Sequence, residues 1–184
     1  MILYHGSPTG GLTELKPLLS EHGKPYVYFA STPVVALLYA VKPVPKPFSF
    51  YPYGFDENGV VYSEYFENAF VDLYKGRTGY LYECDGLKNT DHPTQINCAY
   101  TCHENVKVDR VTEIPDLAVF FKEQEDKGLF RVKHRAEISD REMQFVMDAL
   151  KKEIEANHLK RFLQHPMSVF IRDRFPDAWN AKTD

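Results

Sequence analysis

The chain has 184 residues, of which 26% are charged and 43% hydrophobic, and this composition is typical of a globular protein and excludes wholesale disorder. The 22 basic and 26 acidic residues leave a net charge of −4, which argues against a basic surface that binds nucleic acid non-specifically. The mean hydropathy is −0.41, and no apolar stretch approaches the roughly 20 residues that span a bilayer. We therefore expect a soluble protein with no membrane span and no strong nucleic-acid-binding signal.

The N-terminal segment and the cysteines indicate the cellular compartment. Residues 1–6 lack a basic region followed by a long apolar region, so we expect no signal peptide and a cytoplasmic location. The cysteines are odd in number (Cys84, Cys98 and Cys102), which disfavours a disulfide framework. Their sulfur atoms and the ring of His103 are of the types that bind zinc, but the spacing of these residues is not that of a standard zinc motif. We expect free thiols and no metal.

Short strands and one helix are expected in the first 40 residues. The apolar run over residues 2–5 predicts a strand, which the glycines and prolines after it bring to an end. Residues 26–30 predict a second strand because they are rich in β-formers. Thr32 or Ser31 then fits a helix N-cap, and Pro33 fits the first position of a short, buried helix.

The middle of the chain alternates between loop and strand signals. Residues 42–54 contain four prolines and four aromatic residues, which favours an ordered surface loop. Within residues 60–75, Phe66, Phe70 and Tyr74 are spaced as one face of a helix. Residues 80–84 predict a strand, and residues 105–111 alternate strictly between apolar and polar side chains, which predicts another.

The C-terminal part of the chain is predicted to be helical. Ser139 and Glu142 fit a capping box, and an apolar stripe behind them predicts an amphipathic helix. A second helix is expected after it, with Pro166 as a break or restart. We therefore divide the chain into an α+β domain over residues 1–134 and a helical extension over residues 135–184 that packs on it.

Two short motifs carry a family resemblance. The first is Leu3-Tyr4-His5-Gly6-Ser7, and the second is Tyr26-Val27-Tyr28-Phe29-Ala30-Ser31, followed by a helix that ends at Tyr39. In this order they resemble the ADP-ribosyltransferase family, in particular its poly(ADP-ribose) polymerase and tRNA 2′-phosphotransferase branch. The resemblance implies an α+β fold with a small split, mostly antiparallel sheet, flanking helices and a C-terminal helical hairpin that closes one side.

The resemblance also implies a reaction. The chain would bind NAD⁺ as a co-substrate and transfer ADP-ribose to a protein or nucleic-acid acceptor, with release of nicotinamide. His5 would hydrogen-bond a ribose hydroxyl, and the Gly6 backbone would approach the carboxamide closely because glycine has no side chain. Tyr28 would stack on the nicotinamide ring. Without a ligand, the same histidine could simply end its strand and bond a turn.

Further residues are expected at the cofactor. Tyr26 shares a strand face with Tyr28, because side chains alternate along a strand, and takes the stacking role if the register shifts by two. The resemblance adds Ser7 and Tyr39 to the cofactor-binding residues. Ser7 could instead make a turn with Pro8, and the two strand tyrosines could be ordinary strand residues.

Two positions depart from the family pattern. Ala36 stands where the polymerase branch has a helix serine that holds the carboxamide. In the transferring members a glutamate at the start of a later strand stabilises the cation that develops on the ribose. The strand we align, residues 99–102, begins without a carboxylate. Glu83, Glu104 and Glu142 are the remaining candidates, and the capping box already explains the last of them.

The missing acid leaves other functions open. The chain could be a catalytically inactive nucleotide-binding or protein-interaction domain of the same fold, or an unrelated α+β domain. It could also resemble the RNA 2′-phosphotransferases, which hold a phosphate with arginines. Arg77, Arg110, Arg131 and Arg135 are available for that role, but residues 1–76 contain no arginine.

Overall fold

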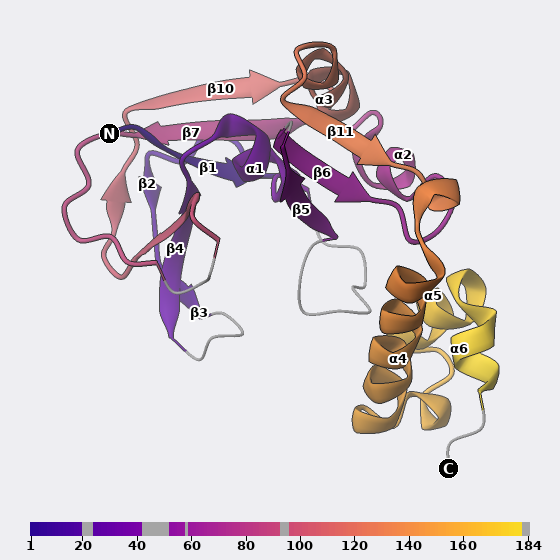
Figure 1. The fold of residues 1–184 in the computed structure, drawn as a ribbon. Coiled ribbons are helices and arrows are strands. Elements are labelled where there is room, and N and C mark those ends of the chain that lie inside the picture. The colour runs from indigo at the N-terminus through magenta and orange to yellow at the C-terminus, as the bar shows by residue number, and fades with distance from the viewer. Residues whose placement is uncertain (20–23, 42–51, 58, 93–95, 182–184) are drawn as a thin grey trace. The chain divides into compact units, whose positions relative to one another are not determined.

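The computed structural model describes residues 1–19, 24–41, 52–57, 59–92 and 96–181. The protein is of the α+β class, with mostly antiparallel sheets and several helices (Figure 1). It consists of two compact units: residues 1–42 with 73–130 form unit 1, and residues 43–72 with 131–184 form unit 2. These units differ from the predicted division at residue 134 in two respects, since residues 43–72 and residues 131–134 group with the C-terminal part. Whether the chain has two domains that divide at residue 134 stays a prediction.

The main sheet of unit 1 has the strand order β10-β7-β1-β4-β3, and β8 also pairs with β4. In Figure 1, β10, β7 and β1 run side by side and β4 runs at a steep angle to them, and β1 pairs with both β7 and β4. The strands predicted from residues 2–5, 26–30 and 80–84 are confirmed as β1, β4 and β7. The strands of this sheet are β1 (Leu3–Ser7), β3 (Leu18–Leu19), β4 (Pro25–Ala30), β7 (Gly79–Cys84), β8 (Ala99–Cys102) and β10 (Arg110–Ile114).

The predicted short helix is confirmed as α1 (Pro33–Leu38). The Thr32 side chain accepts a hydrogen bond from the Val35 backbone at 3.2 Å, and Pro33 occupies the first turn, where its missing N–H is not needed. All side chains after Pro33 in this helix are buried. The helix lies against β1 (Figure 1). Its C-terminal end is tied to the last residue of helix α2 (Ala69–Tyr74), because the Tyr74 hydroxyl donates to the Leu38 carbonyl at 2.8 Å.

A hydrophobic core forms around residues of β1, β4 and β7. A two-stranded sheet of β2 (Glu14–Leu15) and β9 (Val106–Lys107) contributes the pair Leu15 and Val106 to it. The strand predicted over residues 105–111 is therefore two strands, since β9 pairs with β2 whereas β10 pairs with β7. The buried members of this core are Leu3, Leu15, Val27, Phe29, Tyr82, Cys84, Cys102 and Val106. Helix α3 (Leu117–Asp126) completes unit 1.

Unit 2 begins with a three-stranded sheet of order β11-β6-β5. The strands are β5 (Tyr53–Asp56), β6 (Gly59–Ser63) and β11 (Phe130–Lys133). The helix predicted from the spacing of Phe66, Phe70 and Tyr74 is confirmed in part: α2 (Ala69–Tyr74) contains Phe70 and Tyr74, whereas Phe66 precedes it. Before it, Val60, Val61 and Tyr62 of β6 are all buried. Of the loop predicted over residues 42–54, residues 42–51 lie outside the described residues.

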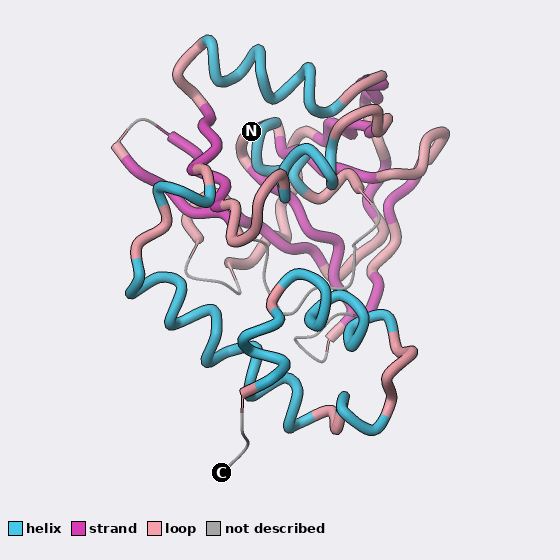
Figure 2. Tube along the Cα trace, turned by 90° about the vertical axis from the view of Figure 1, so that its right-hand side faces the viewer, coloured by secondary structure: helices cyan, strands magenta, loops and turns pink. Residues whose placement is uncertain are grey.

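The rest of unit 2 is helical up to the last described residues (Figure 2). The predicted capping box is confirmed: Ser139 caps α4, and Glu142 bonds back to the Ser139 backbone at 2.9 Å. A new helix, α5, begins at Pro166. In place of one hairpin, three helices and two 3₁₀ turns follow β11: η1 (Arg135–Glu137), α4 (Asp140–Ala156), η2 (Leu159–Arg161), α5 (Pro166–Arg174) and α6 (Pro176–Asn180).

The helices of unit 2 share a core of their own. Its buried members are Val146, Leu150, Ile154, Leu159, Ile171, Phe175, Ala178 and Trp179. Among the helices that the structure describes, none is long and apolar enough to cross a membrane.

Candidate functional site

His5 lies near the middle of β1, where its ring contacts aromatic side chains of both neighbouring strands. The ring centroids of His5 and Phe29 on β4 are 6.1 Å apart, and those of His5 and Tyr82 on β7 are 6.2 Å apart. Burial lowers the pKa of His5, and a hydrogen bond to the Tyr28 carbonyl opposes this effect. His5 therefore prefers the neutral form.

The sheet opens between β1 and β4 next to His5. Tyr4 opposite Ala30 is the register pair that joins the two strands, and β3 pairs with β4 only at its start, at Pro25 and Tyr26. Residues 27–29 of β4 lie between these two pairings, beside His5. The Tyr28 carbonyl accepts a hydrogen bond from His5 Nδ1 at 2.8 Å.

The side chains of His5 and Tyr28 point to opposite faces of the sheet. Residues directly opposite each other share a face, so the pair Tyr4 and Ala30 places Tyr28 on the face of Tyr4. His5 is one residue along from Tyr4 and lies on the other face, as its contact with Phe29 shows. The structure thus brings His5 and Tyr28, the residues expected at the ribose and at the nicotinamide ring, together through the Tyr28 backbone, with one side chain on each face of the sheet.

Gly6 is in close contact with helix α1. A Cβ atom at this position would lie 1.9 Å from the Ala36 carbonyl oxygen, so no larger residue fits without movement of the backbone. Helix packing is thus a sufficient reason for glycine here, beside its expected role at the carboxamide. Ser7 is buried, and its hydroxyl accepts a hydrogen bond from the Thr9 backbone at 3.1 Å, which is the turn interaction weighed from the sequence.

The remaining predicted cofactor residues lie apart from each other. Tyr26 packs against Tyr28, with ring centroids 5.8 Å apart, and against His103, at 4.4 Å. Tyr39 ends α1 and is 40% exposed. His103 was considered from the sequence only as a zinc ligand. His103 lies beside Tyr26 because of the register between β4 and β8, and the spacing of residues along the sequence does not determine that register.

The three candidate acids have partners of different kinds. Glu83 lies on β7 opposite Tyr4, and its carboxylate is 3.8 Å from the Arg110 guanidinium. Glu104 accepts a hydrogen bond from Asn89 at 3.1 Å. Glu142 belongs to unit 2, where Lys133 and Ser139 lower its pKa to about 2. Glu83 is the candidate that shares the main sheet with His5.

Comparisons with known proteins add no relative. No protein-family model, curated protein or solved structure matches the chain. Among the described residues, no group of three or more histidine, cysteine or acidic side chains is placed to hold a metal ion.

Proposed function

We propose that the protein binds NAD⁺ at the opening between β1 and β4, as an ADP-ribosyltransferase-like protein. The observation that carries this proposal is the hydrogen bond of His5 to Tyr28 in the opening, because it joins residues of both motifs of the resemblance. The proposed reaction transfers ADP-ribose to a protein or nucleic-acid acceptor and releases nicotinamide.

The proposed role of His5 follows from its tautomer. Since Nδ1 donates to a carbonyl, the neutral ring carries its lone pair on Nε2. Nε2 can then accept a hydrogen bond from a ribose hydroxyl. The lowered pKa of His5 supports this role, because a protonated ring would have no acceptor to offer.

The proposed nicotinamide contacts come from the same two strands. The Gly6 backbone would bond the carboxamide. Tyr28 and Tyr26 lie on the face of the sheet opposite to His5, so either could stack on the ring only if the nicotinamide reaches that face between β1 and β4. Both tyrosines are half-buried, so each retains surface for a ligand. Ala36 contributes no hydroxyl to this site, and the carboxamide would therefore depend on backbone groups alone.

Transfer also needs an acid near the ribose, and Glu83 is our candidate in unit 1. Its carboxylate lies 3.8 Å from the Arg110 guanidinium, and a carboxylate near the ribose would stabilise the cation that forms there. The arrangement favours a second candidate function as well, which is NAD⁺ binding without transfer. Glu83 lies on β7, so β1 separates it from the opening.

Thermal unfolding with and without millimolar NAD⁺ tests binding, and the variant His5→Asn tests the site. An asparagine amide can replace Nδ1 as the donor to Tyr28, but it has no equivalent of Nε2. Ligand at 100 times its dissociation constant stabilises the wild type by about 2.7 kcal/mol, which raises the midpoint by about 5 to 10 °C. We expect His5→Asn to fold and to lose this shift.

The matched control is His92→Asn. His92 Nδ1 donates to the Ala99 carbonyl at 2.9 Å, so the same exchange is made at the same kind of bond outside the site. This variant should keep the full shift. The absence of any shift in the folded wild type would refute the proposal. A shift without nicotinamide release on addition of acceptor proteins would establish binding without transfer.

A further inference from the structure

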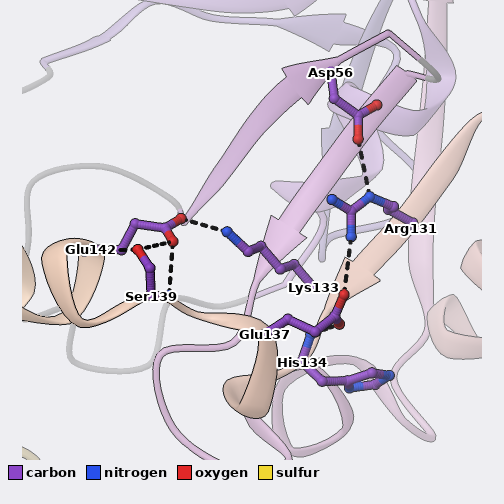
Figure 3. Close-up of polar contacts among 7 residues, drawn as sticks. All are labelled: Asp56, Arg131, Lys133, His134, Glu137, Ser139 and Glu142. Atoms are coloured by element: carbon purple, nitrogen blue, oxygen red, sulfur yellow. Dashed lines mark hydrogen bonds and ion pairs between the residues drawn. The ribbon is translucent and has the colours of Figure 1, made fainter.

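A second pair of residues with chemical potential lies in unit 2, where β6 and β11 end side by side. Glu64 follows β6 and His134 follows β11, and the Glu64 backbone donates to the Lys133 carbonyl at 2.9 Å. This contact holds the two chain segments together. Figure 3 shows the imidazole of His134 turned away from Lys133 and Glu142.

The Glu64 carboxylate is buried and fully engaged. Its side chain is 6% exposed, and Oε1 accepts a hydrogen bond from the Phe70 backbone at 2.9 Å. Oε2 lies 2.9 Å from Nδ1 of His134. A buried carboxylate needs such donors to compensate for the loss of water.

This contact determines which ring nitrogen of His134 carries the proton. An ionised carboxylate only accepts hydrogen bonds, so Nδ1 must donate, and the lone pair of the neutral ring lies on Nε2. The imidazole is 69% exposed although its partner is buried. A buried carboxylate that orients an exposed imidazole in this tautomer is the arrangement that activates histidine as a base or nucleophile.

Another histidine of the same unit has the opposite tautomer. His165 Nδ1 accepts a hydrogen bond from the Met167 backbone at 3.2 Å, so a neutral His165 carries its proton on Nε2. Its outer nitrogen is a donor and has no lone pair to offer. His134 and His165 therefore form an internal comparison of the two tautomers in one protein.

We infer that Glu64 and His134 form a second reactive site, in which Nε2 of His134 attacks activated acyl groups and Glu64 is the positioning residue. The lone pair of Nε2 forms a bond to the acyl carbon, and the carbon–oxygen bond to the leaving group breaks. The leaving oxygen takes the electron pair, and the hydrogen bond to Glu64 stabilises the positive charge that forms on the ring.

Diethyl pyrocarbonate tests this inference, since it transfers an ethoxycarbonyl group to histidine and releases ethyl carbonate, which decomposes to carbon dioxide and ethanol. The rate at each histidine is followed by mass spectrometry of peptides. We expect His134 to react roughly tenfold faster than His165 at neutral pH. In Glu64→Gln, the amide oxygen can still accept from Phe70, but the amide nitrogen then faces Nδ1 and reverses the tautomer. Reaction at His134 should fall about tenfold and reaction at His165 should not change.

The matched control is Glu137→Gln. The Glu137 carboxylate accepts a hydrogen bond from the His134 backbone at 2.7 Å, so this variant removes a nearby negative charge and leaves the ring contact in place. Reaction at His134 should stay within about twofold of the wild type. Equal rates at His134 and His165 in the wild type would overturn the inference, as would a folded Glu64→Gln variant that reacts normally.

A second measurement covers the case in which Glu64→Gln does not fold. The ring nitrogen shifts of wild-type His134 in an NMR spectrum distinguish the two tautomers directly. We expect the proton on Nδ1 for His134 and on Nε2 for His165. A proton on Nε2 of neutral His134 would contradict the inference whatever the variant does.

Discussion

His5 Nδ1 donates to the main-chain carbonyl of Tyr28 at 2.8 Å, although the two side chains lie on opposite faces of the sheet. A side chain of β1 is thus hydrogen-bonded to the main chain of β4. The bond therefore satisfies a backbone group of β4, fixes the tautomer of His5 and links the two motifs of the family resemblance.

The first prediction concerns the pH dependence that His5 causes. Its folded-state pKa is lowered by burial, so the unfolded chain binds the proton more readily than the folded one. The contribution of His5 to stability is present above the unfolded pKa, near pH 6.5, and is lost as the pH falls through the folded pKa. We expect the free energy of unfolding of the wild type to decrease more than that of His5→Asn between about pH 7.5 and about pH 5.5. Chemical denaturation at both pH values measures this, and identical losses in the two proteins would contradict it.

Gly6→Ala tests the packing of α1 on β1. The new Cβ would lie 1.9 Å from the Ala36 carbonyl oxygen, and backbone cannot yield as a flexible side chain would. We expect a loss of about 3 kcal/mol in the free energy of unfolding, measured by denaturant titration. Gly54→Ala is the control, because a Cβ there meets no atom within 4 Å. A Gly6→Ala protein as stable as this control would show that the helix does not pack against the strand as described.

The Glu142 carboxylate should titrate far below an ordinary glutamate. Hydrogen bonds from Lys133, at 2.6 Å, and from Ser139 lower its pKa to about 2 (Figure 3). Its contribution to stability is present above its unfolded pKa and is lost as the pH falls through the folded one. NMR titration of this side chain measures the pKa, and a midpoint near 4.5, the ordinary glutamate value, would contradict the contact.

The variant Glu142→Gln extends this test to stability. Because the side chain is 37% exposed, we expect a loss of at most about 1 kcal/mol at neutral pH. Glu155→Gln, in the last turn of the same helix, is the control and should be neutral or slightly stabilising, since a negative charge is unfavourable at a helix C-terminus.

The helical core of unit 2 has its own reporter. Trp179 is the single tryptophan of the chain and belongs to the same buried cluster as Leu150. Leu150→Ala removes a fully buried side chain and should lower the free energy of unfolding by about 3 kcal/mol, followed by tryptophan fluorescence. Phe145→Ala on the same helix is the control, because Phe145 is 62% exposed and should change little. Equal effects of the two variants would place Leu150 outside the core.

Features that depend on neighbours along the chain were predictable. Thr32 with Pro33, and Ser139 with Glu142, mark the starts of α1 and α4 because each cap is made within about one turn. The aromatic spacing of Phe70 and Tyr74 marked α2, whereas Phe66, the first member of that pattern, lies before the helix begins at Ala69. The alternation over residues 105–111 was real, but different partner strands divided it into two.

The sequence by itself determined the α+β class, the central strands, the starts of α1 and α4, and the two motifs that resemble the ADP-ribosyltransferases. All of these features depend on the types of side chain and on their spacing over a few residues. Only the tertiary structure decided which faces His5 and Tyr28 occupy, and that residues 43–72 group with the C-terminal helices. It alone brought Glu64 to His134, 70 positions further along the chain. The physical reason is that strand register and burial depend on partners distant in sequence, which local hydrogen-bonding preferences do not specify.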